Sequence, residues 1–195
     1  MMPRMLLTIA LIYAAFLMNA QAAEWSVPNV DALPSDAFGQ QVRTGRDLIV
    51  HTAATIGPDA KDPAKRFSGN GLDCQSCHLD GGTKKFGLPL AGIWGVFPLF
   101  IGRENEVRTL EERINGCMER SMNGHVLPLD SVEMKAFLAY AKWLSTGIPA
   151  GVRLTGAGVD RARSGYVAGR CLRPHRSPRP RPHRKNIVID RSRRT

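Results

Sequence analysis

The stretch that decides the fold is Cys74-Gln75-Ser76-Cys77-His78, a C-x-x-C-H sequence. In this pattern two thiols can form thioether bonds to the vinyl groups of haem, and the adjacent histidine can bind the iron from one side. A redox-active cysteine pair would be expected near a strand–helix unit, and a zinc site would need further ligands at suitable spacing. Neither context is visible in the sequence. The motif therefore predicts one covalently attached haem c, held by Cys74 and Cys77, with His78 as an iron ligand.

A short apolar turn, Gly87-Leu-Pro-Leu-Ala-Gly92, places Pro89 eleven residues after His78. A histidine that binds iron normally donates its second ring N–H to a carbonyl, which fixes the orientation of the ring. A rigid turn suits that task, so Pro89 is a candidate for the haem environment. An ordinary turn proline is the alternative, and the sequence leaves both open.

The second axial ligand of the iron is open at this stage. Methionine is a familiar partner of histidine in c-type cytochromes, so a methionine ligand is the simplest expectation. The candidates downstream of the motif carry sulfur or imidazole: Cys117, Met118, Met122, His125 and Met134.

Helix geometry offers a more specific choice among these candidates. Arg113, Cys117 and Ser121 are spaced at i, i+4 and i+8, so they would share one face of a helix. Gly116 would let the backbone approach a flat porphyrin closely. A guanidinium near Cys117 would favour the thiolate, which is the metal-binding form of cysteine.

Hydrophobic periodicity predicts helices and no convincing strand, so the expected fold class is all-α. The first predicted helix has an apolar face made of Phe38, Val42, Gly45 and Ile49. The second begins at the capping-box sequence 109–112, and its face consists of Leu110, Ile114, Cys117 and Met118. The third, capped by residues 130–133 and ended by residues 147–149, presents Met134, Phe137, Leu138, Ala141 and Leu144. A fourth helix is predicted around residues 160–170, and residues 56–73 are expected to form a loop.

The positive charge of the chain is concentrated at one end. The 195 residues have a formal net charge of +10, which by itself would suggest a nucleic-acid or anionic-membrane partner. Residues 172–195 hold nine basic side chains and one acidic side chain, so this tail alone carries +8. Its Arg/Pro/His-rich composition cannot bury enough apolar surface to fold, and a disordered tail is expected.

The N-terminus has the pattern of a secretory signal peptide. Arg4 precedes an apolar stretch from Met5 to Met18, and Ala20-Gln21-Ala22 is a small-x-small cleavage site. The apolar stretch is shorter than a membrane-spanning helix, although an uncleaved anchor is the alternative. The apolar residues 88–101 are interrupted by proline and glycine, so no transmembrane segment is expected in the mature chain. We therefore expect an exported, periplasmic protein, and export argues against a nucleic-acid partner.

The stretch from Gly71 to Gly147 resembles a known family over about half the chain. The run GLDCQSCHLDGGTKKFGLPLAGIWGVFPLFIGRENEVRTLEERINGCMERSMNG is similar to the first haem domain of tetrathionate-forming thiosulfate dehydrogenases, which are periplasmic dihaem c-type cytochromes. The segment RINGCMERSMNG is much more specific than the C-x-x-C-H motif alone. The resemblance implies a cytochrome c domain whose haem is ligated by His78 and Cys117.

The resemblance also implies a substrate and a reaction. Arg103, Arg113 and Ser121 would hold thiosulfate beside the haem, and arginine offers a fixed fork of donors for such oxyanions. Two thiosulfates would give one tetrathionate and two electrons. The electrons would pass through a second haem to a soluble or membrane-bound redox partner, such as another cytochrome c.

Each of these assignments has a simpler alternative. Cys117 could be a buried apolar cysteine, or could form a disulfide with Cys171 in an oxidising compartment. Arg103 and Arg113 could be solvated charges near glutamates, and the case for Ser121 is weaker still. The alternative function is a monohaem electron carrier, or a haem subunit of a sulfur-oxidation complex, without its own substrate chemistry.

The sequence departs from the family after Cys171. Residues 156–171 begin as a second haem domain should, but the next residues are Leu-Arg-Pro-His, so the second C-x-x-C-H motif is absent. A frameshift near codon 172 would explain why the family pattern and the foldable composition end together, and a genuine basic tail is the alternative. The expected division is a signal peptide (1–22), an irregular lead-in (23–35), a cytochrome c domain with one haem (36–150), the start of an incomplete second cytochrome c domain (151–171) and the basic tail (172–195).

Overall fold

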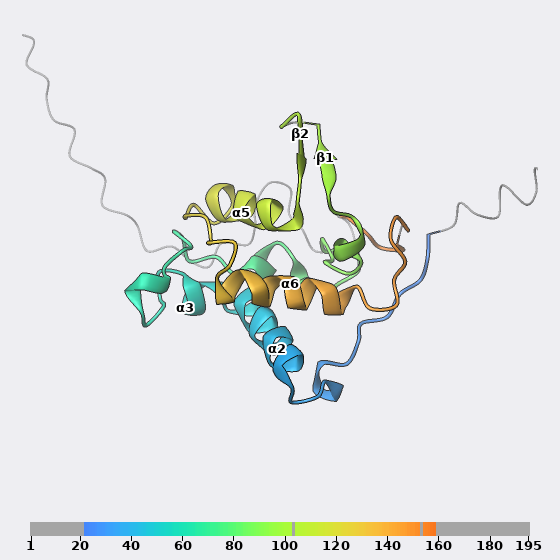
Figure 1. The fold of residues 1–195 in the computed structure, drawn as a ribbon, viewed down its shortest axis with the longest axis horizontal. Coiled ribbons are helices and arrows are strands. Elements are labelled where there is room, and N and C mark those ends of the chain that lie inside the picture. The colour runs from blue at the N-terminus through green and yellow to red at the C-terminus, as the bar shows by residue number, and fades with distance from the viewer. Residues whose placement is uncertain (1–21, 103, 153, 159–195) are drawn as a thin grey trace, which may run out of the picture.

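The computed structural model describes residues 22–102, 104–152 and 154–158. Their α-helices are α2 (Ala37–Val50), α3 (Thr52–Ile56), α4 (Leu79–Gly82), α5 (Leu110–Arg120) and α6 (Val132–Leu144). Short 3-10 turns are η2 (Val30–Ala32), η3 (Pro63–Lys65), η4 (Cys74–Ser76) and η5 (Ile93–Gly95). Two strands, β1 (Leu99–Ile101) and β2 (Glu106–Arg108), form a hairpin that stands out from the helical body (Figure 1).

The core is built where α2 packs against α6. Val42 from α2 and Met134 from α6 are completely buried, and Gly45 allows the close approach because a Cβ there would collide with the Ala136 carbonyl. Burying side chains of this kind contributes roughly 1.5–3 kcal/mol each. The apolar face predicted for the first helix is confirmed at Val42, Gly45 and Ile49, but Phe38 is 47% exposed.

The helix boundaries follow from local capping. At α5, Thr109 Oγ1 accepts from the Glu112 N–H and a Glu112 carboxylate oxygen accepts from the Thr109 N–H, which confirms the predicted capping box. At α6, the capping residue within the predicted segment 130–133 is Ser131, whose hydroxyl accepts from the Met134 N–H at 3.1 Å. Gly147, with φ of 75°, follows the end of α6, as the sequence predicts.

The β1–β2 hairpin corrects the expected all-α fold class. The strands are antiparallel, with Phe100 opposite Val107, and the described fold is mostly helical with one small sheet. Each strand has three residues, which is too short for the alternation that predicts a strand. Ion pairs support the hairpin, because Arg108 lies 3.1 Å from Glu104 and 2.7 Å from Glu106.

A second, smaller core lies at the other edge of the domain. Trp25, Ala91 and Leu154 are buried together, so the expected lead-in contributes a side chain to the folded structure. Ala23 and Leu154 form a parallel β-bridge, which brings the two ends of the described chain side by side. The helix predicted at residues 160–170 and the basic tail lie outside the described residues.

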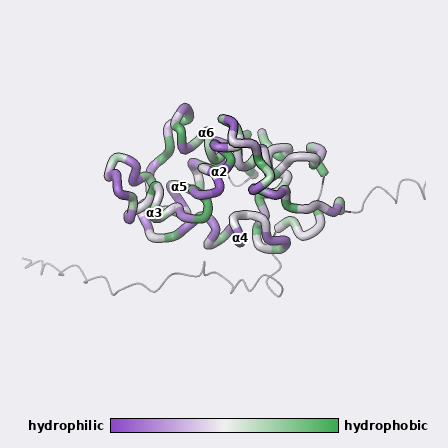
Figure 2. The backbone as a smooth tube through the Cα atoms, turned by 90° about the horizontal axis from the view of Figure 1, so that it is seen from below, coloured by the Kyte–Doolittle hydropathy of each residue, from purple (hydrophilic) through white to green (hydrophobic). Residues whose placement is uncertain are grey.

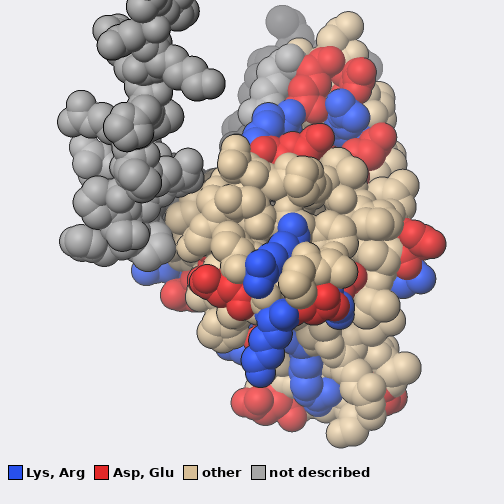
Figure 3. Space-filling model, turned by 90° about the vertical axis from the view of Figure 1, so that its left-hand side faces the viewer, with Lys and Arg blue, Asp and Glu red and all other residues tan. Residues whose placement is uncertain are grey.

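The surface of the described domain carries charges of both signs. On the face in Figure 3, Lys and Arg side chains lie beside Asp and Glu side chains, and neither sign forms a large field. Figure 2 shows a hydrophilic stretch at the end of the molecule near α3, and more hydrophobic backbone where α2 and α6 meet. No helix within the described ranges is long and apolar enough to cross a membrane.

Candidate functional site

An apolar cavity of about 310 Å³ lies between the C-x-x-C-H motif and α5. Its polar side chains come from two places: Asp73, Cys74, Cys77 and His78 from the motif region, and Arg113, Cys117 and Ser121 from α5. The rest of the lining is hydrophobic or aromatic and includes Ile49, Leu72, Leu90, Ile93, Phe97, Leu110, Ile114, Met118, Met122, Phe137, Tyr140 and Ala141. An apolar cavity with a few convergent polar groups is suited to a large, mostly hydrophobic cofactor.

The motif is fixed to the junction between α2 and α3. The Cys74 N–H donates to Thr52 Oγ1 at 2.9 Å, and Gln75 Nε2 donates to the Val50 carbonyl at 2.8 Å. Asp73 Oδ1 accepts from the Ala53 N–H at 2.9 Å. Thr52 is completely buried, and its hydroxyl donates to the Leu48 carbonyl at 2.6 Å. These contacts place the two cysteines at the cavity wall.

His78 is oriented by a backbone carbonyl. Its Nδ1 lies 2.8 Å from the Leu88 oxygen, which is the residue before Pro89, so Pro89 shapes the turn and its neighbour supplies the acceptor. Burial lowers the pKa of His78 below its usual value; the hydrogen bond to Leu88 acts in the opposite direction and the charge of Arg113 lowers it further. A neutral ring that donates through Nδ1 leaves Nε2 available as a metal ligand.

The motif cysteines differ in their state. Cys74 and Cys117 are free thiols, whereas Cys77 is disulfide-bonded. Burial raises the pKa of the Cys74 thiol to about 11, so this thiol is protonated at neutral pH. Because Cys117 is free, the alternative disulfide between Cys117 and Cys171 is not formed here.

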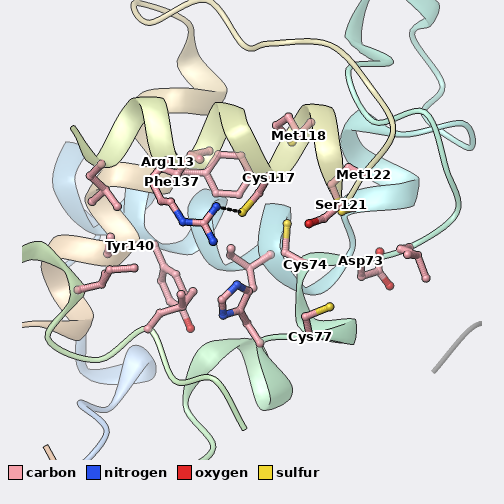
Figure 4. A pocket seen from close by; sticks show the side chains of 18 of the residues that line it. Asp73, Cys74, Cys77, Arg113, Cys117, Met118, Ser121, Met122, Phe137 and Tyr140 are labelled. Atoms are coloured by element: carbon pink, nitrogen blue, oxygen red, sulfur yellow. Dashed lines mark hydrogen bonds between the residues drawn. The ribbon is translucent and has the colours of Figure 1, made fainter. Parts of the chain in front are cut away.

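The predicted residues Arg113 and Cys117 of α5 and Ser121, the C-cap of this helix, all line the cavity. Arg113 Nη1 donates to Cys117 Sγ at 2.9 Å, and Figure 4 shows this pair facing Cys74 and Cys77. Ser121 lies at the end of α5 toward solvent, and its carbonyl accepts from Asn70. Arg103, the remaining candidate, lies outside the described residues.

The other candidates for the second axial ligand separate into two groups. Met118 and Met122 are buried and line the cavity, whereas Met134 is buried in the core and His125 is exposed, and neither lines it. The position of Gly116 differs from expectation, because it does not line the cavity and the Arg120 guanidinium lies over it. The structure therefore leaves Cys117, Met118 and Met122 within reach of a bound cofactor.

Tyr140 is a cavity residue that sequence reasoning missed. Its hydroxyl donates to the Gly81 carbonyl at 2.9 Å, in the turn that follows His78, and burial raises its pKa to about 12. Tyr140 lies three residues after Phe137 on α6, so the helical spacing that identified Phe137 could have identified it too.

Comparisons with known proteins show what this chain is similar to. Residues 64–150 match the family described as SoxA/TsdA, cytochrome c domain. The chain is 37% identical over 132 residues to a thiosulfate dehydrogenase of Psychrobacter arcticus, and 40% identical over 138 residues to one of Allochromatium vinosum. These alignments cover 68% and 69% of this chain but 38% and 48% of the two relatives.

A solved structure shows the same similarity. The as-isolated thiosulfate dehydrogenase (TsdBA) from Marichromatium purpuratum matches with a TM-score of 0.61 and 32% identity. The match covers 72% of this chain and 32% of that chain. The chain therefore spans less than half the length of the relatives that it matches.

Proposed function

Because residues 64–150 belong to the SoxA/TsdA cytochrome c domain family, we propose that the chain is a periplasmic haem c protein that accepts electrons from thiosulfate. A cytochrome c domain implies a haem c cofactor. The observation that carries the proposal is the cavity, which has the attachment motif on one wall and the Arg113–Cys117 pair on the other. The names of the relatives support thiosulfate as the substrate class.

The cavity residues fit a covalent haem. Cys74 and Cys77 would form the thioethers, His78 would bind the iron on one side, and Cys117 would bind it on the other. The hydrogen bond from His78 to Leu88 supports the first iron ligand, and the position of Cys117 on the opposite wall supports the second. When bound, the haem supplies a one-electron acceptor in a largely apolar surrounding.

Arg113, Ser121 and Arg103 would hold the substrate. Thiosulfate is a dianion, and the Arg113 guanidinium offers it paired N–H donors in a cavity with few other polar groups. Two thiosulfates lose one electron each and join through a new S–S bond, which gives one tetrathionate without release of a proton. The two electrons need acceptors, which we assign to a second haem domain or to an external protein of the cytochrome c class.

The ends of the chain complete the proposal. The signal-like residues 1–22 would direct export, and haem attachment to exported chains is consistent with the motif. Residues 151–171 would be the start of a second haem domain whose continuation is lost by a frameshift near codon 172. Turnover by this chain alone would then depend on an external electron acceptor.

The test is thiosulfate-dependent reduction of the haem in protein purified from the periplasm. A pyridine haemochrome assay first establishes that haem is covalently attached. Thiosulfate is then expected to reduce the wild-type haem, and Cys117→Ala and Cys117→Met are expected to abolish this reduction and change the absorption spectrum. Met122→Leu removes a rival sulfur ligand and is expected to keep the wild-type spectrum.

Two outcomes would contradict the proposal. Absence of covalent haem in the wild-type protein would refute the cytochrome assignment. Covalent haem with a methionine-ligand spectrum that Met122→Leu removes, together with no response to thiosulfate, would instead support a monohaem electron carrier.

A further inference from the structure

Three segments that are far apart in the sequence meet beside the loop that follows His78. Residues 23–25 and 154–158 run together as a strap, in which the Thr155 N–H donates to the Ala23 carbonyl at 2.9 Å. The strap lies against residues 85–88 of the loop. Neither of its two segments lines the cavity, so the strap has no direct contact with a ligand bound there.

Trp25 is the central side chain of the strap. It is 8% exposed, and it packs with Leu154 and Ala91 in the smaller core. Its Nε1 donates to the Thr155 carbonyl at 2.9 Å, and Lys85 Nζ lies 5.7 Å from the centre of its ring. Lys85 also pairs with Glu24 at 2.6 Å, so the strap and the loop are joined by apolar, polar and charged contacts.

Backbone hydrogen bonds connect the strap to the proposed iron ligand. The Leu88 N–H donates to the Gly158 carbonyl at 3.0 Å, and the Phe86 N–H donates to the Gly156 carbonyl at 2.7 Å. The carbonyl of the same Leu88 accepts from His78 Nδ1 at 2.8 Å. Leu88 therefore connects the strap with the histidine: its N–H bonds to the strap, and its carbonyl bonds to His78.

The loop needs this support because its backbone is unfavourable. Phe86 and Leu88 have φ values of 64° and 52°, which are rare for bulky residues and persist only where surrounding contacts hold them. Both residues donate their N–H groups to the strap. Without the strap, Leu88 would be free to return to ordinary backbone angles, and its carbonyl would turn away from His78.

We propose that the strap is a positioning device for the iron ligand His78, with Trp25 as its key side chain. This inference rests on the proposed function, because it assumes that His78 binds haem iron. A histidine that donates to a carbonyl is a more basic ligand, and a more basic ligand favours oxidised iron. Loosening the strap should therefore raise the reduction potential of the haem.

The experiment compares two pairs of variants of the haem-loaded protein, by spectroelectrochemical titration without substrate. Trp25→Phe keeps an aromatic ring and removes the N–H donor. Its control is Trp94→Phe. Trp94 also lies under a lysine, with Lys142 Nζ 5.1 Å from the centre of its ring, but it is 40% exposed. Gly158→Ala disfavours the φ of 89° that orients the Gly158 carbonyl. Its control is Gly151→Ala, because Gly151 has φ of 75° and, like Gly158, has open space where the alanine methyl group would lie.

Trp25→Phe and Gly158→Ala are expected to raise the potential relative to the wild type, while both controls keep the wild-type value. Haem content by pyridine haemochrome is measured for every variant, so that a folding defect in Trp25→Phe leaves the Gly158 pair as the deciding comparison. A wild-type potential in Gly158→Ala with full haem content would overturn the inference. Failure of the proposed function gives a different result, because the wild-type protein would then contain no covalent haem.

Discussion

Arg113 is the residue through which the α5 wall of the cavity can be tested directly. Its guanidinium donates to Cys117 Sγ and faces the space where an anion would meet the haem. We expect Arg113→Gln to raise the KM for thiosulfate by about 10- to 100-fold, because a hydrogen bond to a charged group contributes about 1.5–3 kcal/mol. Steady-state kinetics with an artificial electron acceptor measure this change.

Arg120→Gln is the matched control for that prediction. Arg120 lies on the same helix, but it pairs with Glu104 at 2.9 Å and does not line the cavity. Its KM should therefore stay at the wild-type value. Equal KM values for the two variants would contradict a binding role for Arg113.

Tyr140 gives a prediction for alkaline pH. Its pKa is raised to about 12 in the folded protein, against a usual value near 10. The folded state thus holds the proton more tightly, so this contribution to stability is complete below pH 10 and is lost as the pH rises toward 12. The free energy of unfolding should fall by at most about 3 kcal/mol through this group.

Tyr140→Phe should lack that component of the pH dependence. Urea unfolding of both proteins at a series of pH values between roughly 9 and roughly 12 measures it, and other titrating groups cancel in the comparison. Parallel stability profiles for the two proteins would contradict a raised pKa for Tyr140 in the folded state.

For single residues, the sequence predicted the positions of side chains better than those of backbone groups. Spacing along a helix placed Arg113 and Cys117 on one face, and the structure brings them to 2.9 Å. The sequence located the turn 87–92 that holds the acceptor of the His78 hydrogen bond, but it could not single out the Leu88 carbonyl, because this geometry depends on a positive φ that a leucine rarely adopts. Gly116, which was expected to let the backbone approach the porphyrin, does not line the cavity.

Among the elements, the anchoring of η4 on the α2–α3 junction makes a specific prediction. Thr52→Val keeps the shape of the side chain but leaves the part-buried Cys74 N–H without an acceptor. We expect it to lower the free energy of unfolding of the haem-loaded protein by about 1–3 kcal/mol. We also expect less covalent haem per chain, because Cys74 is less firmly placed.

Thr55→Val is the control on the same short helix. The Thr55 hydroxyl also donates to a backbone carbonyl, that of His51 at 2.8 Å, but it does not contact the motif. Thr55→Val should lower the free energy of unfolding by less than Thr52→Val does, and it should leave the haem content unchanged. Denaturant unfolding measures the stability of both variants. If their free energies of unfolding and their haem contents are equal, Thr52 has no anchoring role.

The elements that the sequence predicted are those with strong local signals. The three long helices have an apolar stripe and a capping residue each, and the structure contains all three. The hairpin was missed because Phe100 and Val107 are both exposed, so no buried face imposes a pattern on its strands. The smaller core was missed because Trp25 and Leu154 come together only in the folded chain.

For the whole molecule, the sharpest prediction concerns the gene. The nucleotide sequence after codon 171, translated in the other two frames, is expected to contain a C-x-x-C-H motif followed by a foldable sequence. The reason is that two changes occur together at residue 172: the resemblance to the second haem domain ends, and the Arg/Pro/His-rich tail with its charge of +8 begins. If neither frame encodes such a motif, the frameshift hypothesis fails and the basic tail is genuine.

The strap also has a consequence for the order in which the domain folds. The hydrogen bond from Trp25 to Thr155 joins residues 130 positions apart, so it closes one of the longest loops in the domain. Contacts of such long range form late in folding, because they need most of the chain to be ordered first. A chain made from its N-terminus therefore presents the C-x-x-C-H motif well before residues 154–158 emerge. On the proposed function, haem would be attached in that interval, before the strap packs against residues 85–88.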